Sequence, residues 1–149
     1  MNFNKIFALG FIYGSFLEWG VHKHLFHRHG KKKGSPFAFH IREHHLECLK
    51  NENRHDDFSL RENVGVLLII ALHLPVLYLS TGLFVGMTLY GFAFMTLHKL
   101  IHKNVAWGKK WFPWHWDHHM KHQNHNFNVV LPIADHVMRT RKKYLTSLL

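Results

Sequence analysis

The residues with the clearest chemical potential form the segment Trp114–His119, in which three imidazoles fall within five positions. His115 lies three positions before His118 and four positions before His119. In an α-helix, these separations place side chains on one face, about one turn apart. Neutral imidazole is the commonest protein ligand for metal ions, and its second ring nitrogen needs a partner that orients the ring. The spacing therefore predicts a helix that presents metal ligands.

Histidines recur in three further groups along the chain. The chain has 17 histidines, and ten of them fall in the four groups, which is more than histidines satisfied in a protein core would explain. Imidazole ligands suit Zn, Cu, Fe or Ni, and a closed structural zinc site takes four of them. Ten ligands exceed what one ion can use, so we expect two ions. The predicted ligands are His22, His27, His40, His44, His45, His98, His102, His115, His118 and His119.

Several side chains beside these groups are candidates to orient the imidazoles through hydrogen bonds. The acidic candidates are Glu18, Asp117 and Asp135, and the histidines His122 and His125 are further candidates for outer partners or alternative ligands. The acidic residues could equally be ordinary surface or helix-end charges, and for the two histidines a position as solvated loop residues is favoured.

A ferritin-like di-iron site is disfavoured by the pattern of acidic residues. Such a site needs carboxylate ligands and Glu-x-x-His pairs on helices. The pair Glu52 and His55 has this spacing, but it lies in a polar connection. The chain has one cysteine, Cys48, which excludes a disulfide within the chain and is expected to be a free thiol.

A long uncharged segment predicts the elements that position the histidines. The 36 residues from Asn63 to His98 contain no Asp, Glu, Lys or Arg, and one membrane span needs only about 20 apolar residues. A break at Ser80–Gly82 divides the segment into two predicted helices, Val64–Leu79 and Leu83–His98. Ile6–Val21 is a candidate first span, because no small-residue cleavage site follows it as in a signal peptide.

These elements predict an all-α integral membrane protein. It is expected to form a single domain over residues 1–149, with about three spans and a histidine-rich helical cap.

The positive charge is partitioned in a way that predicts the orientation. The formal net charge is +10, which alone would allow nucleic-acid binding. However, nine Lys and Arg residues lie between Val21 and Asn63, nine lie from Lys99 onward, and only Lys5 precedes the first span. Three spans place both basic segments on one side, which is expected to be cytoplasmic. The histidine groups and the C-terminus then face the cytoplasm, and no nucleic-acid partner is expected.

The order of the histidine groups resembles the histidine boxes of the membrane fatty acid hydroxylase and sterol desaturase superfamily. Glu18–His27 resembles the first box, His98–His102 the third and His115–His119 the last, while Phe127–Thr140 is similar to the closing segment of the family. The second box, His40–His45, departs from the usual pattern because three residues rather than two follow its first histidine.

The resemblance implies an enzyme that hydroxylates or desaturates a lipid C–H bond. It implies two Fe ions, for which Zn can substitute on purification, and O2 as a co-substrate. It also implies electrons from an external b-type cytochrome or ferredoxin system, and a lipid substrate that enters from the bilayer. Two alternatives stay open: a carotenoid hydroxylase-type enzyme, and a non-catalytic membrane metal-binding protein. A transporter would need ionisable residues deep in its spans, where this chain has only His73.

Overall fold

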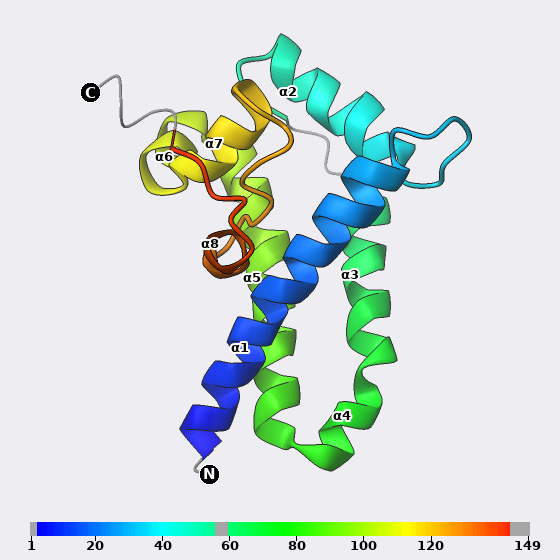
Figure 1. The fold of residues 1–149 in the computed structure, drawn as a ribbon, viewed down its shortest axis with the longest axis vertical. Coiled ribbons are helices and arrows are strands. Elements are labelled where there is room, and N and C mark those ends of the chain that lie inside the picture. Colours follow the sequence, from blue (N-terminus) through cyan, green and yellow to red (C-terminus); the bar gives the residue numbers. More distant parts are fainter. Residues whose placement is uncertain (1–2, 56–59, 144–149) are drawn as a thin grey trace.

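The computed structural model describes residues 3–55 and 60–143. Within these ranges the chain is helical and has no β-strand, as predicted. Figure 1 shows α1, α3 with α4, and α5 running along the molecule, with the remaining elements gathered at one end. The elements, with π-helices marked η, are α1 (Phe3–Gly20), η1 (Val21–His29), η2 (His40–His45), α2 (Leu46–Lys50), α3 (Leu60–Leu72), α4 (Leu74–Leu79), α5 (Thr81–Lys103), α6 (Val105–Trp111), α7 (Pro113–Met120) and α8 (Ile133–Val137).

Glycines allow α1 and α5 to cross with their backbones in close contact. A Cβ atom added to Gly10 of α1 would collide with the carbonyl oxygen of Leu83, and one added to Gly86 of α5 would collide with that of Phe7. Small residues at such crossings are typical of membrane helices, in which close van der Waals packing replaces the hydrophobic effect as the force for association. The crossing fixes the end of α1 that leads into η1 relative to the histidine-bearing end of α5.

The predicted helical hairpin is present, with an interruption in its first arm. Residues 60–79 form α3 and α4, which are separated at His73, and Ser80 is extended before α5 begins. The His73 side chain is satisfied locally, because its Nδ1 atom lies 2.8 Å from the carbonyl oxygen of Ile69 and its Nε2 atom lies 3.0 Å from the Tyr13 hydroxyl. His73 is therefore held within the bundle, away from the other histidines.

One helix of the described chain, α5, is long and apolar enough to cross a membrane. Its 23 residues would extend about 35 Å at 1.5 Å per residue. The 18-residue α1 and the interrupted α3–α4 arm do not pass the same test of length and hydropathy, so the predicted three spans stay a prediction.

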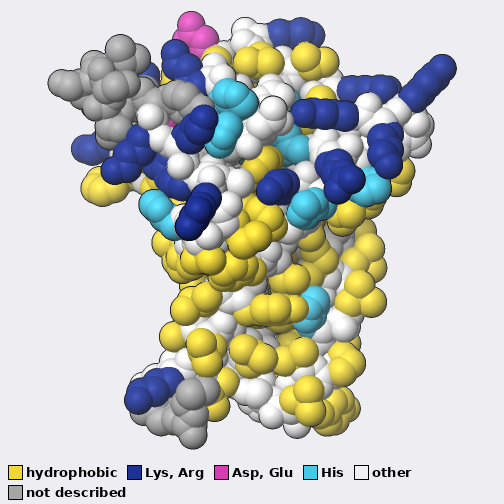
Figure 2. Space-filling model, in the orientation of Figure 1, with side chains coloured by type: hydrophobic (Ala, Val, Ile, Leu, Met, Phe, Trp, Pro, Cys, Tyr) yellow, Lys and Arg dark blue, Asp and Glu magenta, His cyan; other side chains and the backbone are white. Residues whose placement is uncertain are grey.

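The surface divides into an apolar part and a basic part. Figure 2 shows mostly apolar side chains over the long helices and Lys, Arg and His side chains around the other end. Large apolar side chains are exposed on α3 and α4, among them Leu68, Leu72, Tyr78 and Leu79. Exposed apolar surface of this extent marks a surface that contacts a partner or a membrane.

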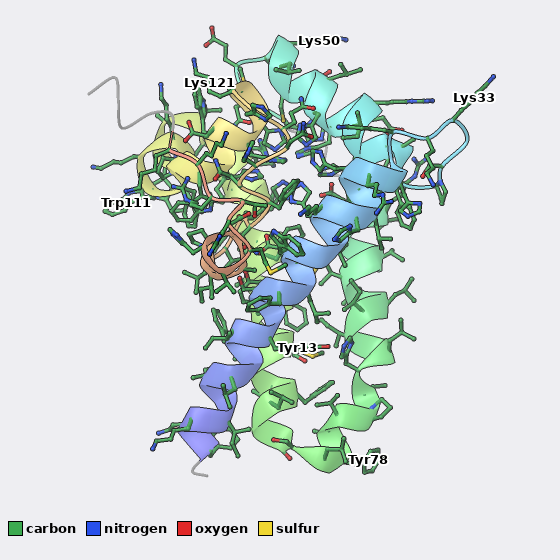
Figure 3. All side chains as sticks on the ribbon, viewed as in Figure 1. Tyr13, Lys33, Lys50, Tyr78, Trp111 and Lys121 are labelled. Atoms are coloured by element: carbon green, nitrogen blue, oxygen red, sulfur yellow. The ribbon has the colours of Figure 1, made fainter. Side chains whose placement is uncertain are left out.

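The cap predicted beyond the long helices is helical. η1 continues α1, η2 runs directly into α2, and α6 and α7 follow the end of α5. Figure 3 shows many nitrogen-bearing side chains converging between these elements. The segment after α7 returns to α1, against which α8 packs. The ten predicted ligands, which lie within residues 22–45 and 98–119 of the sequence, are thus gathered at one end of the molecule.

Candidate metal centre

Two π-helical segments bring together histidines that an ordinary α-helix would separate. His22 and His27 are five positions apart on η1, and His40 and His45 are five apart on η2. In an α-helix of 3.6 residues per turn, residues five apart diverge by about 140°. A π-helix has i→i+5 hydrogen bonds, so that residues five apart lie about one turn apart. The wider winding therefore directs both members of each pair to the same side.

The first histidine cluster joins three elements of the cap. Its members are all buried, and each offers one ligand atom within 4.8 Å of the others. η1 contributes two members, η2 contributes two and α7 contributes one. We call this set cluster 1, and it consists of His22, His27, His40, His45 and His118.

The second histidine cluster lies beside the first and uses the end of α5. Cluster 2 consists of His44, His98, His102 and His119, which are buried and meet the same distance limit. His115 falls outside this limit but is adjacent, since its Nε2 atom lies 2.9 Å from that of His102. All ten predicted ligands are therefore either in a cluster or in contact with one.

Adjacent histidines in the sequence serve different clusters. His44 belongs to cluster 2 and His45 to cluster 1; His118 belongs to cluster 1 and His119 to cluster 2. Neighbouring residues on a helix point about 100° apart, so each His-His pair straddles the boundary between the clusters. The rings of His45 and His119 are in contact, with centroids 4.2 Å apart. The two clusters are thus adjoining parts of one centre.

The nitrogen separations in cluster 1 suit ligands of a common ion. The Nε2 atoms of His22 and His40 lie 2.9 Å apart, those of His27 and His118 lie 3.1 Å apart, and those of His40 and His45 lie 3.2 Å apart. Two nitrogens bound at about 2.1 Å to one ion lie about 3.0 Å apart at a right angle and about 3.4 Å apart at the tetrahedral angle.

The ring nitrogens of His119 give separate support for metal binding in cluster 2. Both of its ring nitrogens are buried, and neither makes a hydrogen bond to a residue that the structure describes. Such a buried polar group is costly unless it has a partner, which a metal ion would supply. The buried histidine clusters could therefore hold metal ions.

Burial keeps the clustered imidazoles in the form that binds metal. Burial lowers the pKa of His118 to about 3, although its hydrogen bond to the carbonyl oxygen of His125 opposes the shift. Burial also lowers the pKa of His119, and the neighbouring His45 reinforces that effect. The same direction and cause apply to His22, His27, His40, His44, His45 and His115. These rings are neutral at pH 7, as metal ligands must be.

Backbone carbonyl oxygens lie within hydrogen-bond distance of the Nδ1 atoms of several clustered histidines; we call these the outer nitrogens. The Nδ1 atom of His22 lies within hydrogen-bond distance of the Phe127 carbonyl oxygen, and that of His118 lies 2.6 Å from the His125 carbonyl oxygen. In cluster 2, the Nδ1 atom of His102 lies 2.8 Å from the carbonyl oxygen of Asn53. A ring that donates through Nδ1 presents its Nε2 lone pair to an ion. These carbonyls therefore orient the rings toward the centre.

Asp135 and Glu18 support the closing segment that supplies one of these carbonyls, that of Phe127. The Asp135 carboxylate accepts hydrogen bonds from the backbone N–H groups of Phe127 (3.0 Å) and Asn128 (2.7 Å). The Glu18 carboxylate accepts from the Asn128 side chain at 3.1 Å, from the Val129 N–H, and from the Tyr90 hydroxyl. Both carboxylates thus hold residues 127–129 in place, one step away from the imidazoles that they were predicted to orient.

The other predicted outer partners occupy different positions. Asp117 is buried on α7. His122 is exposed and His125 is half-buried; their Nδ1 atoms lie 3.1 Å apart, so their side chains bond each other outside the clusters. His125 contributes to the centre through its backbone carbonyl.

Glu62 is a buried carboxylate that sequence reasoning did not select. One of its oxygens lies 3.2 Å from the Nδ1 atom of His40 in cluster 1, and the other lies 3.4 Å from the Nδ1 atom of His98 in cluster 2. Its place just before the uncharged segment was the available signal, because a carboxylate at the end of a span can face the cap. The spacing of Glu62 relative to the histidines gave no such signal.

Two residues near cluster 2 lie outside its set of converging atoms. The thiol of Cys48 is buried, and its sulfur lies 3.5 Å from the Nδ1 atom of His102, on the outer side of that ring. The ring of His55 lies 5.0 Å from that of His44 by centroid. By contrast, His136 is exposed on α8.

An apolar cavity of about 380 Å³ reaches the clusters from the side of the long helices. Its lining includes His22, His40 and His98, the carboxylates of Glu18 and Glu62, and apolar side chains of α1, η1, α3 and α5. Leu68 and Leu72 line it as well as being exposed on the apolar surface, so the cavity borders that surface. Cavities of this size accept small organic ligands.

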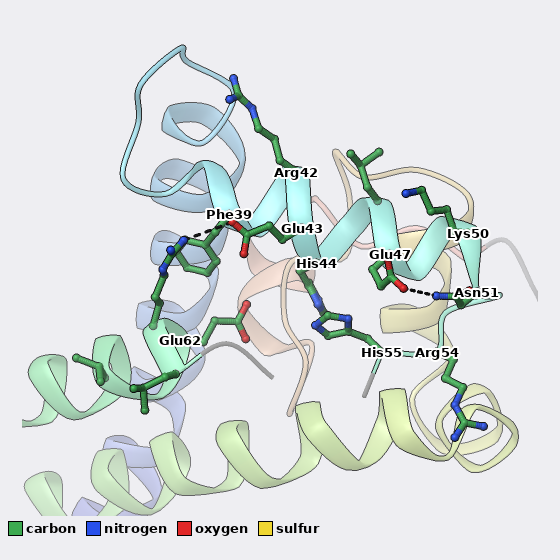
Figure 4. A pocket seen from close by; sticks show the side chains of 14 residues that line it. Phe39, Arg42, Glu43, His44, Glu47, Lys50, Asn51, Arg54, His55 and Glu62 are labelled. Atoms are coloured by element: carbon green, nitrogen blue, oxygen red, sulfur yellow. Dashed lines mark hydrogen bonds and ion pairs between the residues drawn. The ribbon is translucent and has the colours of Figure 1, made fainter. Parts of the chain in front are cut away.

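A second, larger pocket borders η2, α2 and the start of α3 and is lined mainly by charged and polar side chains. It measures about 1220 Å³, and Figure 4 shows His44, Glu62 and several charged side chains lining it. Clustered histidines thus line both pockets: His44 lines the polar pocket, and His22, His40 and His98 line the apolar cavity. No protein-family model, no curated protein and no solved structure matches this chain significantly.

Proposed function

We propose that this protein is a membrane-bound di-iron oxygenase that hydroxylates or desaturates a lipid C–H bond with O2 and electrons from an external donor. One observation carries the proposal: three buried imidazoles from two adjoining clusters, His22, His40 and His98, line an apolar cavity. A metal store would need the clusters but not the cavity. A structural zinc site would need four closed ligands rather than ten.

The position of the cavity supports an apolar chain as the substrate. It lies between α1, α3 and α5, and its rim includes residues exposed on the apolar surface. Burying each methylene group of a lipid contributes about 0.8 kcal/mol, and a bilayer would supply such chains directly at this surface. A C–H bond of the chain would then lie beside His22, His40 and His98, which line the cavity.

The donor set supports iron as the metal. Neutral imidazoles suit Fe as well as Zn and Cu, and iron bound there would supply O2 activation and the two-electron oxidation of the substrate. The protein's own residues have other tasks. Nitrogen ligands are held in orientation by the carbonyls of Asn53, His125 and Phe127. The apolar side chains of the cavity exclude water and position the lipid chain.

The membrane assignment rests on several features together. α5 is long and apolar enough to span, α1 packs against it through glycines, and the exposed surface of α3 and α4 is apolar. In this arrangement the cap and the C-terminus lie on the basic side, which the positive-inside rule places in the cytoplasm.

Lipid profiling of cells with and without the protein tests the proposed reaction. We expect a lipid that gains an oxygen atom, taken from labelled O2, or loses a pair of hydrogens. His119→Ala should abolish this product because it removes a ligand of cluster 2. His136→Ala is the matched control, since this histidine is exposed on α8 and lies outside both clusters.

The comparison must be normalised to membrane-inserted protein. If His119→Ala forms as much product as His136→Ala, the clusters are not the catalytic site. If the wild-type protein binds metal but changes no lipid, it is a metal-binding membrane protein without this activity.

A further inference from the structure

Glu62 joins the two clusters through their outer nitrogens. It lies on the first turn of α3, and its side chain is 5% exposed. Its two carboxylate oxygens face different histidines, with 3.2 Å to the Nδ1 atom of His40 and 3.4 Å to the Nδ1 atom of His98. Figure 4 shows the Glu62 carboxylate pointing from α3 toward the part of the polar pocket in which His44 lies.

The geometry on the cluster side fits this role. The Nε2 atom of His40 lies 2.9 Å from that of His22 and 3.2 Å from that of His45, so this nitrogen faces the centre of cluster 1. His98 is a member of cluster 2, and its ring lies 4.9 Å from that of His102 by centroid. Each ring can donate a proton from Nδ1 to Glu62 and present Nε2 to an ion.

We propose that Glu62 is a shared positioning residue, which fixes the Nδ1–H tautomer of one ligand in each cluster and supplies one negative charge beside both clusters. The proposal rests on the metal centre proposed above. Hydrogen bonds from ligating imidazoles to carboxylates raise the basicity of the ligand. With otherwise neutral ligands, the carboxylate also offsets part of the charge that two cations bring into a buried site.

If Glu62 orients one histidine in each cluster, its substitutions should affect metal binding in a way that a loss of packing alone would not. In Glu62→Gln, the amide retains the shape of the side chain but has one acceptor oxygen instead of two, and its NH2 group must face a donor. It can therefore orient either His40 or His98, but not both. Glu62→Ala can orient neither.

Metal titration of detergent-purified protein tests the proposal, with Co2+ as the spectroscopic probe and a competing chelator. Glu62→Gln should weaken one Co2+ site 10- to 100-fold, as is typical for loss of an outer partner, and should weaken the other site less, because that site loses only the negative charge. Glu62→Ala should weaken both. Glu43→Gln is the control, because Glu43 lines the same polar pocket but is exposed and pairs with Arg61.

The proposal is overturned if the Glu62→Gln protein binds two Co2+ ions with the affinity and absorption spectrum of the wild type. That result would mean that Glu62 only fills space, because the isosteric substitution preserves packing. A wild-type protein that binds no Co2+ overturns it as well. Wild-type protein that binds two Co2+ ions but oxidises no lipid contradicts the proposed enzyme and leaves the assignment of Glu62 standing.

A second measurement avoids substitutions altogether. In wild-type protein loaded with Zn2+, nitrogen-15 NMR of the imidazoles should show the proton of His40 and of His98 on Nδ1. A proton on Nε2 of either ring would contradict the assignment, whatever the variants do.

Discussion

The double variants His27→Ala/His118→Ala and His118→Ala/His119→Ala are expected to retain different amounts of metal. His27 and His118 are 91 positions apart but both belong to cluster 1. His118 and His119 are adjacent but belong to different clusters. The first variant therefore damages one site twice, and the second damages both sites once.

The size of the difference follows from the loss of single ligands. Loss of an outer partner alone weakens metal binding 10- to 100-fold, so loss of a ligand should cost at least that factor, or about 1.4 to 2.7 kcal/mol. When free metal equals the wild-type Kd of each site, half of each site is filled. A tenfold loss reduces this filling to about one tenth.

Equilibrium dialysis against buffered Co2+, followed by elemental analysis, measures the difference. At that free metal concentration we expect about one ion per wild-type chain. We expect about one half for His27→Ala/His118→Ala, and about one fifth or less for His118→Ala/His119→Ala. Equal metal content in the two double variants would refute the division of the histidines between two clusters. Circular dichroism and membrane insertion control for misfolding.

Three further predictions concern topology, pH and the cavity. Cysteines introduced at Lys33 and Lys143 should be labelled from the same side of the membrane and a cysteine at Ser80 from the other; labelling of positions 33 and 143 from opposite sides would exclude the three-span arrangement. Unfolded histidines titrate near 6.5, whereas burial lowers the pKa of His118 to about 3. As the pH falls below about 6.5, the unfolded state therefore gains protons that the folded metal-free protein does not, which reduces the free energy of unfolding by up to about 1.4 kcal/mol per pH unit for each such imidazole. A melting temperature that stays constant between about pH 7 and 5 would contradict this. Gly65 lines the cavity, and an added Cβ there has no atom within 4 Å, so Gly65→Phe should reduce lipid oxidation and leave metal content unchanged; unchanged oxidation would show that the lipid binds elsewhere.

The sequence predicted which histidines belong together because local spacing carries that information. His98 and His102 lie one α-helical turn apart on α5, as do His115 and His119 on α7. The uncharged segment likewise predicted a helical hairpin whose turn lies at Ser80. Both inferences depend on periodicity and hydropathy, which act over a few neighbouring residues.

The sequence did not reveal how the groups divide between clusters. His22 and His27 share a side only because η1 is π-helical, and the spacing of the histidines alone predicted an ordinary α-helix. The separation of His118 from His119 requires knowing which element packs against each face of α7.

The sequence also did not reveal which side chains and backbone groups the buried carboxylates contact. Glu62 meets His40 and His98 across separations of 22 and 36 positions in the chain. Asp135 was selected as a partner of imidazoles, yet its carboxylate holds backbone N–H groups of the closing segment. The Asn128 side chain donates hydrogen bonds to the Ser15 carbonyl oxygen and to the Glu18 carboxylate. These contacts arise from the fold as a whole.

The metal content and ligand type of the intact protein test the dinuclear centre most directly. Protein purified in detergent without oxygen, and reconstituted with Fe2+, should contain about two ions per chain by elemental analysis. X-ray absorption at the iron edge should show nitrogen or oxygen neighbours at about 2.1 Å with imidazole scattering. One ion or none per chain, or a spectrum without imidazole ligands, would contradict the assignment of the two histidine clusters.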